Sequence, residues 1–189
     1  MADTFERIDA QLRSWIERQH VFFVATAPRA DDGLLNCSPK GLDSLRVLDD
    51  RTIAYLDLTG SGVETIAHLK ENGRIILMLC AFDGPPRIVR LQGRGTVVHP
   101  GETEFDALVA RFPPQRGVRS VIRIELIRMS DSCGYAVPRM DFVAEREALT
   151  KWAEKKGPDG VIEYQRNTNA QSLDGLTGVD WLAERLARD

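Results

Sequence analysis

Residues 54–82, AYLDLTGSGVETIAHLKENGRIILMLCAF, contain parts of two strands joined by a glycine-rich turn and a short helix. The β-branched and aromatic residues of Thr52–Leu58 predict the first strand, and the nearly continuous apolar run Arg74–Phe82 predicts a buried second strand. Between them, Val63–Glu71 has helical periodicity, and Asn72-Gly73 supplies the residues that a left-handed helix cap prefers. The stretch therefore predicts a sheet whose connections include short helices.

The flanking sequence extends this sheet. Four further strands are predicted at His20–Ala27, Leu34–Lys40, Arg87–His99 and Arg119–Ser130. Further helices are predicted at Thr4–Gln19 with Thr4 as N-cap, at Gly101–Phe112, at Asp141–Lys156 where Gly157-Pro158 ends it, and from Asp180 onward. Gly93 and Gly95 predict a bulge or a barrel corner.

Six strands with interspersed short helices fit a mainly β (α+β) fold, a closed or split antiparallel barrel with a helical C-terminal tail. Alternating βα units of the parallel type are absent, so the pattern fits such a barrel better than a doubly wound sheet. We expect residues 1–140 to form the barrel with its N-terminal helix, and residues 141–189 to form a helical extension of the same domain.

Composition narrows the functional class. The chain has 189 residues, is 43% hydrophobic and carries a formal net charge of −3, so nucleic acid is not an expected partner. No apolar run reaches the length of a membrane span, and the acidic start lacks the apolar core of a signal peptide. The scattered cysteines Cys37, Cys80 and Cys133 predict free thiols in a reducing cytoplasm, and no His/Asp/Glu cluster has metal-ligand spacing.

Thr59-Gly60-Ser61-Gly62 is the first candidate binding motif. Glycines let backbone N–H groups approach an anion, and the start of a helix favours negative charge. The hydroxyl groups of Thr59, Ser61 and Thr65 can add hydrogen bonds. The alternative is the ordinary start of a helix, with Ser61 as its cap.

The segment Asn36–Gly41, NCSPKG, is the second candidate. Pro39 in a strand pattern removes a hydrogen-bond donor, so it requires an edge or a bulge and leaves backbone free for another contact. Lys40 can supply a point charge for a phosphate. The alternative is a strand end with a solvated lysine.

For two further segments, the sequence does not decide between a role in a site and an ordinary structural role. In Arg87–Gly95, RIVRLQGRG, the side chains of Arg90, Gln92 and Arg94 share one face of the strand, where they either line a site or face water. The segment Asp131–Pro138, DSCGYAVP, suits a lid or an interface loop. A half-buried, unreactive Cys133 is favoured over a nucleophile, because the sequence places no histidine beside it.

Taken together, the segments NCSPKG, AYLDLTGSGVETIAHLKENGRIILMLCAF and PPRIVRLQGRGTVV (residues 85–98) resemble the pyridoxamine 5′-phosphate oxidase-like, FMN-binding split-barrel proteins. The resemblance covers about residues 15–130. The stretch SCGYAVP and the helical tail are similar to one bacterial subfamily of undefined function.

The resemblance implies a homodimer of six-stranded split barrels that binds FMN in a groove between the subunits. Carried over by position, the implied flavin contacts are Ser38, Pro39, Lys40, Thr59, Gly60, Ser61, Thr65, Arg90 and Gln92. An unknown small-molecule substrate or electron donor would meet the flavin there. The resemblance identifies no catalytic acid or base.

The chain also departs from the family pattern. The true oxidases carry a basic pair where this chain has Ser61–Thr65, SGVET. Lys40, Arg46 or Arg90 would therefore have to neutralise the charge of the phosphate. Their C-terminal arginine-histidine motif is missing, which argues against oxidation of pyridoxamine phosphate. An FMN-dependent oxidoreductase is therefore weighed against a non-catalytic binding protein for FMN, haem or a deazaflavin, and against a cofactor-free dimeric module.

Overall fold

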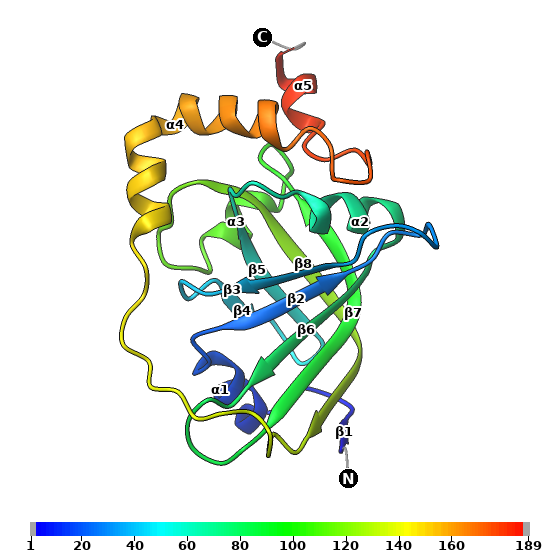
Figure 1. The fold of residues 1–189 in the computed structure, drawn as a ribbon, viewed down its shortest axis with the longest axis vertical. Coiled ribbons are helices and arrows are strands. Elements are labelled where there is room, and N and C mark those ends of the chain that lie inside the picture. Colours follow the sequence, from blue (N-terminus) through cyan, green and yellow to red (C-terminus); the bar gives the residue numbers. More distant parts are fainter. Residues whose placement is uncertain (1–2, 187–189) are drawn as a thin grey trace.

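One curled antiparallel sheet forms the body of the chain in a computed structural model that describes residues 3–186, with side chains to residue 183. Its strands are β1 (Thr4–Phe5), β2 (Phe22–Thr26), β3 (Asn36–Lys40), β4 (Leu45–Val47), β5 (Thr52–Leu58), β6 (Arg74–Cys80), β7 (Ile88–Val98) and β8 (Val118–Ser132). The strand order is β3-β2-β6-β7-β8-β5-β4, and β1 pairs with β8 (Figure 1). The sheet is thus a barrel that stays split between its two end strands.

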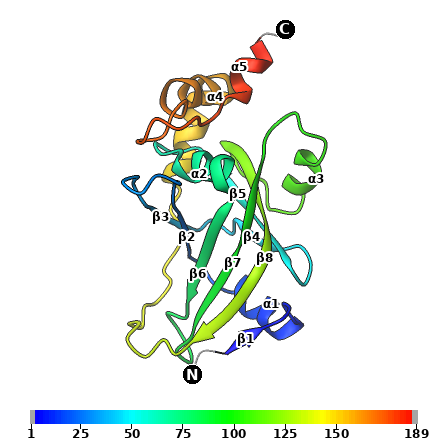
Figure 2. The same ribbon diagram turned by 90° about the vertical axis from the view of Figure 1, so that its right-hand side faces the viewer.

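Helices lie at the ends and on the outside of this barrel. They are α1 (Ala10–Glu17), α2 (Glu64–Asn72), α3 (Phe105–Val109), α4 (Ala148–Thr168) and α5 (Trp181–Leu186). The helix α2 covers one end of the curled sheet, α1 lies at the opposite end, and α4 and α5 pack beyond α2 (Figures 1 and 2). No helix in the part of the chain that the structure describes is both long and apolar enough to cross a membrane.

The barrel interior is the main hydrophobic core. Alternate residues of each strand point inward, as the buried Ile53 and Tyr55 of β5 illustrate. Val179, Trp181 and Leu182 of the C-terminal segment join the same core. A second cluster fills the space between the other face of β5 and β8 and the helix α3; it consists of Ala54, Leu56, Val98, Leu108, Phe112 and Val121.

The predicted fold class, a split antiparallel barrel with few helices, is confirmed. The strand at Thr52–Leu58 has the predicted bounds, and Gly73 ends α2 in the left-handed conformation with φ 69°. A register shift between Gln92 and Gly93 confirms a bulge at the first of the two predicted glycines. Two short strands, β1 and β4, add to the six predicted, because segments of two or three residues carry too little pattern to be recognised.

The first predicted helix was too long. Thr4 is not its N-cap, because Thr4 and Phe5 pair with Ser130 and Met129 of β8. The helix begins at Ala10 instead, where the side chain of Asp9 accepts a hydrogen bond of 2.7 Å from the backbone N–H of Leu12.

The predicted helix at 141–156 was also wrong at both ends. Residues 141–147 are extended, and α4 runs from Ala148 to Thr168 across Gly157-Pro158. Gly157 takes φ 67° and ψ 169°, which breaks the helical backbone at one residue. Pro158 then begins a second helical segment, where its missing N–H costs no hydrogen bond. The pair therefore makes a kink within α4 and does not end it.

Candidate functional site

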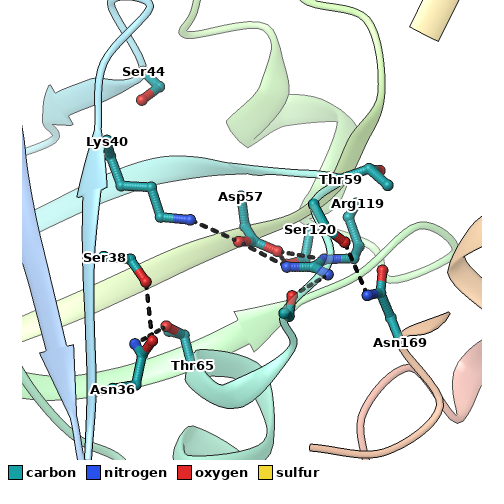
Figure 3. A network of polar contacts seen from close by, with 12 residues as sticks. Asn36, Ser38, Lys40, Ser44, Asp57, Thr59, Thr65, Arg119, Ser120 and Asn169 are labelled. Atoms are coloured by element: carbon teal, nitrogen blue, oxygen red, sulfur yellow. Dashed lines mark hydrogen bonds and ion pairs between the residues drawn. The ribbon is translucent and has the colours of Figure 1, made fainter. Parts of the chain in front are cut away.

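A buried ion cluster bridges the split in the barrel. The carboxylate of Asp57 on β5 accepts hydrogen bonds of 2.8 and 3.2 Å from Arg119 of β8 and lies 3.5 Å from the ammonium of Lys40 on β3 (Figure 3). The hydroxyl of Ser120 donates to the same carboxylate at 3.2 Å. Because β3 is one end strand of the sheet order and β5 lies next to the other end strand, β4, these side chains connect two strands that no backbone ladder joins.

The cluster carries two positive charges against one negative charge. Burial alone would raise the pKa of Asp57, but the charges of Arg119 and Lys40 and the hydrogen bonds to the carboxylate outweigh it, so the pKa lies below its ordinary value. The carboxylate therefore stays ionised and turns Lys40 inward. Arg119 also donates to the carbonyl oxygen of Gly62 at 2.9 Å, which ties the turn before α2 to the cluster.

A second, neutral network lies beside the first. The hydroxyl of Ser38 donates to Asn36 at 2.9 Å, and the amide of Asn36 donates to Thr65 of α2 at 3.0 Å (Figure 3). Thr26 lies 2.9 Å from Nδ1 of His68, whose ring is fully buried. Burial lowers the pKa of His68, so its imidazole is neutral near pH 7.

The turn Thr59–Gly62 is held by the C-terminal segment. Gln165 of α4 donates to the hydroxyl of Thr59 at 2.7 Å, and Asn169 donates to the carbonyl oxygen of Gly60 at 3.0 Å. The N-cap of α2 is Val63 and makes no side-chain cap hydrogen bond, so Ser61 is not the cap.

Two carboxylates stand near the start of α2. Glu64 occupies its first turn and accepts from the backbone N–H of Leu173, while Asp174 accepts from the N–H of Leu34. A phosphate at this helix start would meet their negative charge. The turn is therefore a poor site for the phosphate of FMN, because the two carboxylates would repel it.

The remaining predicted residues lie on the outer face of the sheet. Pro39 points away from Ser38 and Lys40 because strand neighbours alternate. Arg90 and Gln92 share the outer face of β7, where Arg90 donates to Ser132 at 2.8 Å. The structure thus brings Ser38, Lys40 and Thr65 to the split and its adjoining network, Thr59, Gly60 and Ser61 to the turn, and Pro39, Arg90 and Gln92 to the outer face.

Gln92 lines a shallow groove of about 590 Å³ on this face. We call it the outer groove; it is lined by Ala25, Thr26, Ala27, Leu35, Asn36, Cys37, Arg74, Ile75, Ile76, Gln92, Gly93, Arg94, Ile127 and Arg128. Arg74, Arg94 and Arg128 donate to neutral oxygens, of Pro28, Asn72 and Ser130 respectively. None of the three pairs with a carboxylate among residues 3–183.

The donor set of the outer groove fits a phosphorylated aromatic ligand. Arginine matches phosphate geometry with two parallel donors, and the apolar side chain of Ile76 offers a floor for a ring. By contrast, Lys40 is paired with Asp57, and Arg46 with Asp43 at 2.6 Å. Arg74 and Arg128 carry no signal in the sequence, and Arg94 carries one only through the strand face that it shares with Arg90 and Gln92.

The described residues contain no candidate metal site and no disulfide. No group of His, Cys, Asp and Glu side chains within the described residues could hold a metal ion. Cys37, Cys80 and Cys133 are free thiols, as predicted.

Residues 8–133, which span the barrel from α1 to β8, match the sequence profile described as pyridoxamine 5′-phosphate oxidase. The chain belongs to the pyridoxamine 5′-phosphate oxidase family. The match ends where the sheet ends, so the family assignment rests on the barrel and not on the C-terminal segment.

Among curated proteins, this family member is similar to the pyridoxamine 5′-phosphate oxidase family protein ustO of Aspergillus flavus. The two are 39% identical over 192 aligned positions, which cover 93% of this chain and 77% of the fungal protein. The similarity therefore extends into the C-terminal segment beyond the family match.

Two solved structures share the fold. A single-residue variant of HupZ of Group A Streptococcus aligns with a TM-score of 0.51 at 22% identity over 66% of this chain and 99% of that one. A putative pyridoxamine 5′-phosphate oxidase of Lactobacillus delbrueckii aligns with a TM-score of 0.51 at 18% identity over 67% of this chain and 97% of that one. At these identities the likeness concerns the fold alone.

Proposed function

We propose that this protein binds a flavin, FMN, against the outer face of its sheet, at the interface of a homodimer. The observation that carries the proposal is the outer groove, whose three arginines donate to neutral oxygens and flank an apolar floor. Family membership supports the same cofactor class.

The outer groove supplies the binding contacts in this proposal. Arg94 and Arg128 hold the phosphate and Cys37 borders the ring, while Pro39, on the same outer face of β3, is a predicted contact just beyond the groove. Gln92 lines this groove and Arg90 lies on the same outer face, so both stay contacts in this proposal. The contacts at Ser38, Lys40, Thr59, Gly60, Ser61 and Thr65 remain predictions of the family resemblance alone, because these residues lie at the split and the turn and do not line the outer groove. Of these, Lys40 takes the role of holding β3 in place through Asp57.

A second copy of the chain completes the groove in this proposal. Leu35 and Ile127 at its rim are 82% and 67% exposed in the single chain, and neighbouring apolar residues of this size favour burial by another molecule. A closed two-fold dimer buries the same face on both copies.

We further propose an oxidoreductase that acts on an unknown small molecule or electron donor. A bound flavin supplies the redox chemistry, and the chain orients it and excludes water. We assign the protein to the cytoplasm, where the exposed thiols of Cys37 and Cys133 stay reduced. Residues 1–140 form the flavin-binding barrel and residues 141–189 an extension of the same domain, since Val179 and Trp181 enter the barrel core.

The test compares FMN with riboflavin, which lacks the phosphate. We expect the full-length protein to retain FMN through gel filtration and to bind it at least about tenfold more tightly than riboflavin, as one charge-assisted arginine contact predicts. The double substitution Arg94→Ala/Arg128→Ala removes this preference. The matched control Arg123→Ala, on β8 beside Glu104, keeps it.

Other results would overturn the proposal in different ways. A Soret band in the purified protein indicates haem, and a retained deazaflavin indicates a different cofactor. No retained chromophore after reconstitution indicates a cofactor-free dimeric module. Oxidation of NAD(P)H with an electron acceptor, present with bound FMN and absent without it, separates an enzyme from a carrier.

A further inference from the structure

A long segment without helix or strand crosses the outside of the barrel. We call residues 133–147 the strap; it connects β8 to α4 and passes the outer side of β2 and β3 (Figures 1 and 2). It contacts the barrel at several places. The ring of Phe142 stacks on His20 at 3.7 Å between centroids, Met140 donates a backbone hydrogen bond to Phe82, and Glu145 accepts one from Leu42.

A cavity of about 1040 Å³ lies between the strap and the sheet. Phe23 of β2 and Pro39 of β3, which are cross-strand partners, form its inner side. Met140 and Phe142 form the strap side, and Phe82 also lines the cavity. We call this space the strap cavity. Its size is that of a site for a small organic ligand, and its two aromatic sides can enclose a planar ring.

The charges around the strap cavity cancel. Its basic residues Arg18, Lys40 and Arg146 are matched by the acidic residues Asp83, Asp141 and Glu145. Lys40 is itself paired with Asp57, which does not line the cavity, so the lining offers no excess of positive charge. Unlike the outer groove, the strap cavity therefore does not favour an anionic ligand.

The side chains of the strap are poorly covered in the single chain. Met140 is 55% and Phe142 51% exposed, although both line the cavity. A ligand in the cavity would bury apolar surface on both residues, which is a favourable change in free energy.

The strap cavity adjoins the outer groove along one strand pair. Ala25 and Cys37 line the groove, and the pair Phe23 and Pro39 lines the cavity. The two pairs are two residues apart on the same face, about 7 Å along the strands. A ligand in the cavity would thus lie next to anything held in the groove.

We propose that the strap cavity is a second binding site, for a mainly apolar, uncharged ligand that carries an aromatic ring. The strap forms the outer wall of this site. The idea that this ligand is the substrate of a flavin in the outer groove rests on the proposed function. The idea that the strap cavity binds such a ligand does not rest on it.

The neutral fluorescent probe N-phenyl-1-naphthylamine tests the binding site in the full-length protein without added flavin. We expect saturable binding of one probe per chain with enhanced fluorescence. Phe142→Ala weakens the affinity about tenfold, which corresponds to one lost aromatic contact. The control Val143→Ala, at a neighbouring strap residue that is 91% exposed and does not line the cavity, leaves it unchanged. Absence of saturable binding, or equal losses in both variants, overturns the proposal.

Two further measurements separate this proposal from the others. If a second copy of the chain fills the cavity, the probe does not bind and Phe142→Ala weakens the dimer in light scattering, which also overturns the proposal. Arg94→Ala/Arg128→Ala should lose the preference for FMN over riboflavin and keep the probe. Probe binding that depends on Phe142 in a protein that retains no FMN would refute the flavin and leave the strap site standing.

Discussion

At the scale of single residues, the carboxylate of Asp57 is the anion that holds two cations together in the buried cluster. It is fully buried and lies between Lys40 and Arg119, which belong to different strands. We expect Asp57→Asn to lower the free energy of unfolding by about 3–5 kcal/mol, because it leaves two cations in the cluster without their counter-ion. Urea unfolding followed by circular dichroism measures this change.

A surface ion pair provides the control for Asp57. The carboxylate of Asp43 pairs with Arg46 but its side chain is 60% exposed. We expect Asp43→Asn to change the free energy of unfolding by less than about 1 kcal/mol. Equal changes in the free energy of unfolding for the two substitutions would contradict the prediction that the buried pair contributes more to stability than the exposed pair.

The buried imidazole of His68 predicts a pH dependence. Burial lowers the pKa of His68 in the folded chain, although the nearby carboxylates of Asp174, Glu64 and Glu71 oppose the shift. The unfolded chain keeps the ordinary value of about 6.5. As the pH falls through that value, the unfolded state takes up the proton first, so the free energy of unfolding decreases until the folded state is protonated as well.

Urea unfolding at pH 7.5 and at lower pH values checks this prediction. We expect His68→Gln to lose less stability than the unsubstituted protein between these pH values. A slope that is unchanged in His68→Gln would contradict the prediction.

At the scale of elements, the C-terminal segment docks on the turn before α2 by close packing. A Cβ at Gly178 would clash with the carbonyl oxygen of Asn169 and would lie 2.9 Å from Val63. We expect Gly178→Val to cost about 1–3 kcal/mol, as overpacking does, and to release the contacts of Asn169 with the turn. Limited proteolysis with trypsin should then cleave within residues 148–186 sooner.

Gly160, inside α4, provides the matched control. A Cβ there meets the Cβ of Lys156 at 3.4 Å, an ordinary contact for a helix surface. We expect Gly160→Ala to leave proteolysis unchanged or slower, because alanine favours the helix. Faster cleavage in both variants would mean that the docking does not depend on the packing at Gly178.

At the scale of the whole molecule, the outer face of the sheet is the surface on which the proposed dimer depends. Ile127 on β8 is 67% exposed and lines the outer groove. We expect the protein to have the mass of a dimer in light scattering, and Ile127→Glu to shift it to the mass of a monomer, since the substitution places a charge in the interface. The monomeric variant should also lose FMN.

A second exposed apolar residue, outside the proposed interface, provides the control for Ile127. Leu173, in the C-terminal segment, is 78% exposed but lies outside the outer groove. Leu173→Glu should therefore remain a dimer. A dimer that persists in Ile127→Glu would place the interface on another face.

The two networks at the split illustrate how far the candidate site could be predicted. The alternation of β3 separates Pro39 from Ser38 and Lys40, and this follows from the sequence once the strand is recognised. The charge partner of Lys40 does not follow, because Asp57 lies on a strand that β3 does not pair with. Likewise, Arg74 and Arg128 meet Arg94 only after β6, β7 and β8 are placed in register.

By itself, the sequence determined the strand at Thr52–Leu58, the cap at Gly73 and the class of the fold, because periodicity and turn chemistry act over a few neighbouring residues. The tertiary structure alone decided the path of the strap and the kink at Gly157, where the local pattern predicted one helix that ended. It also decided the buried pair of Asp57 and Arg119, which are 62 residues apart. Such contacts depend on the register between distant strands, and the packing of the whole barrel sets that register.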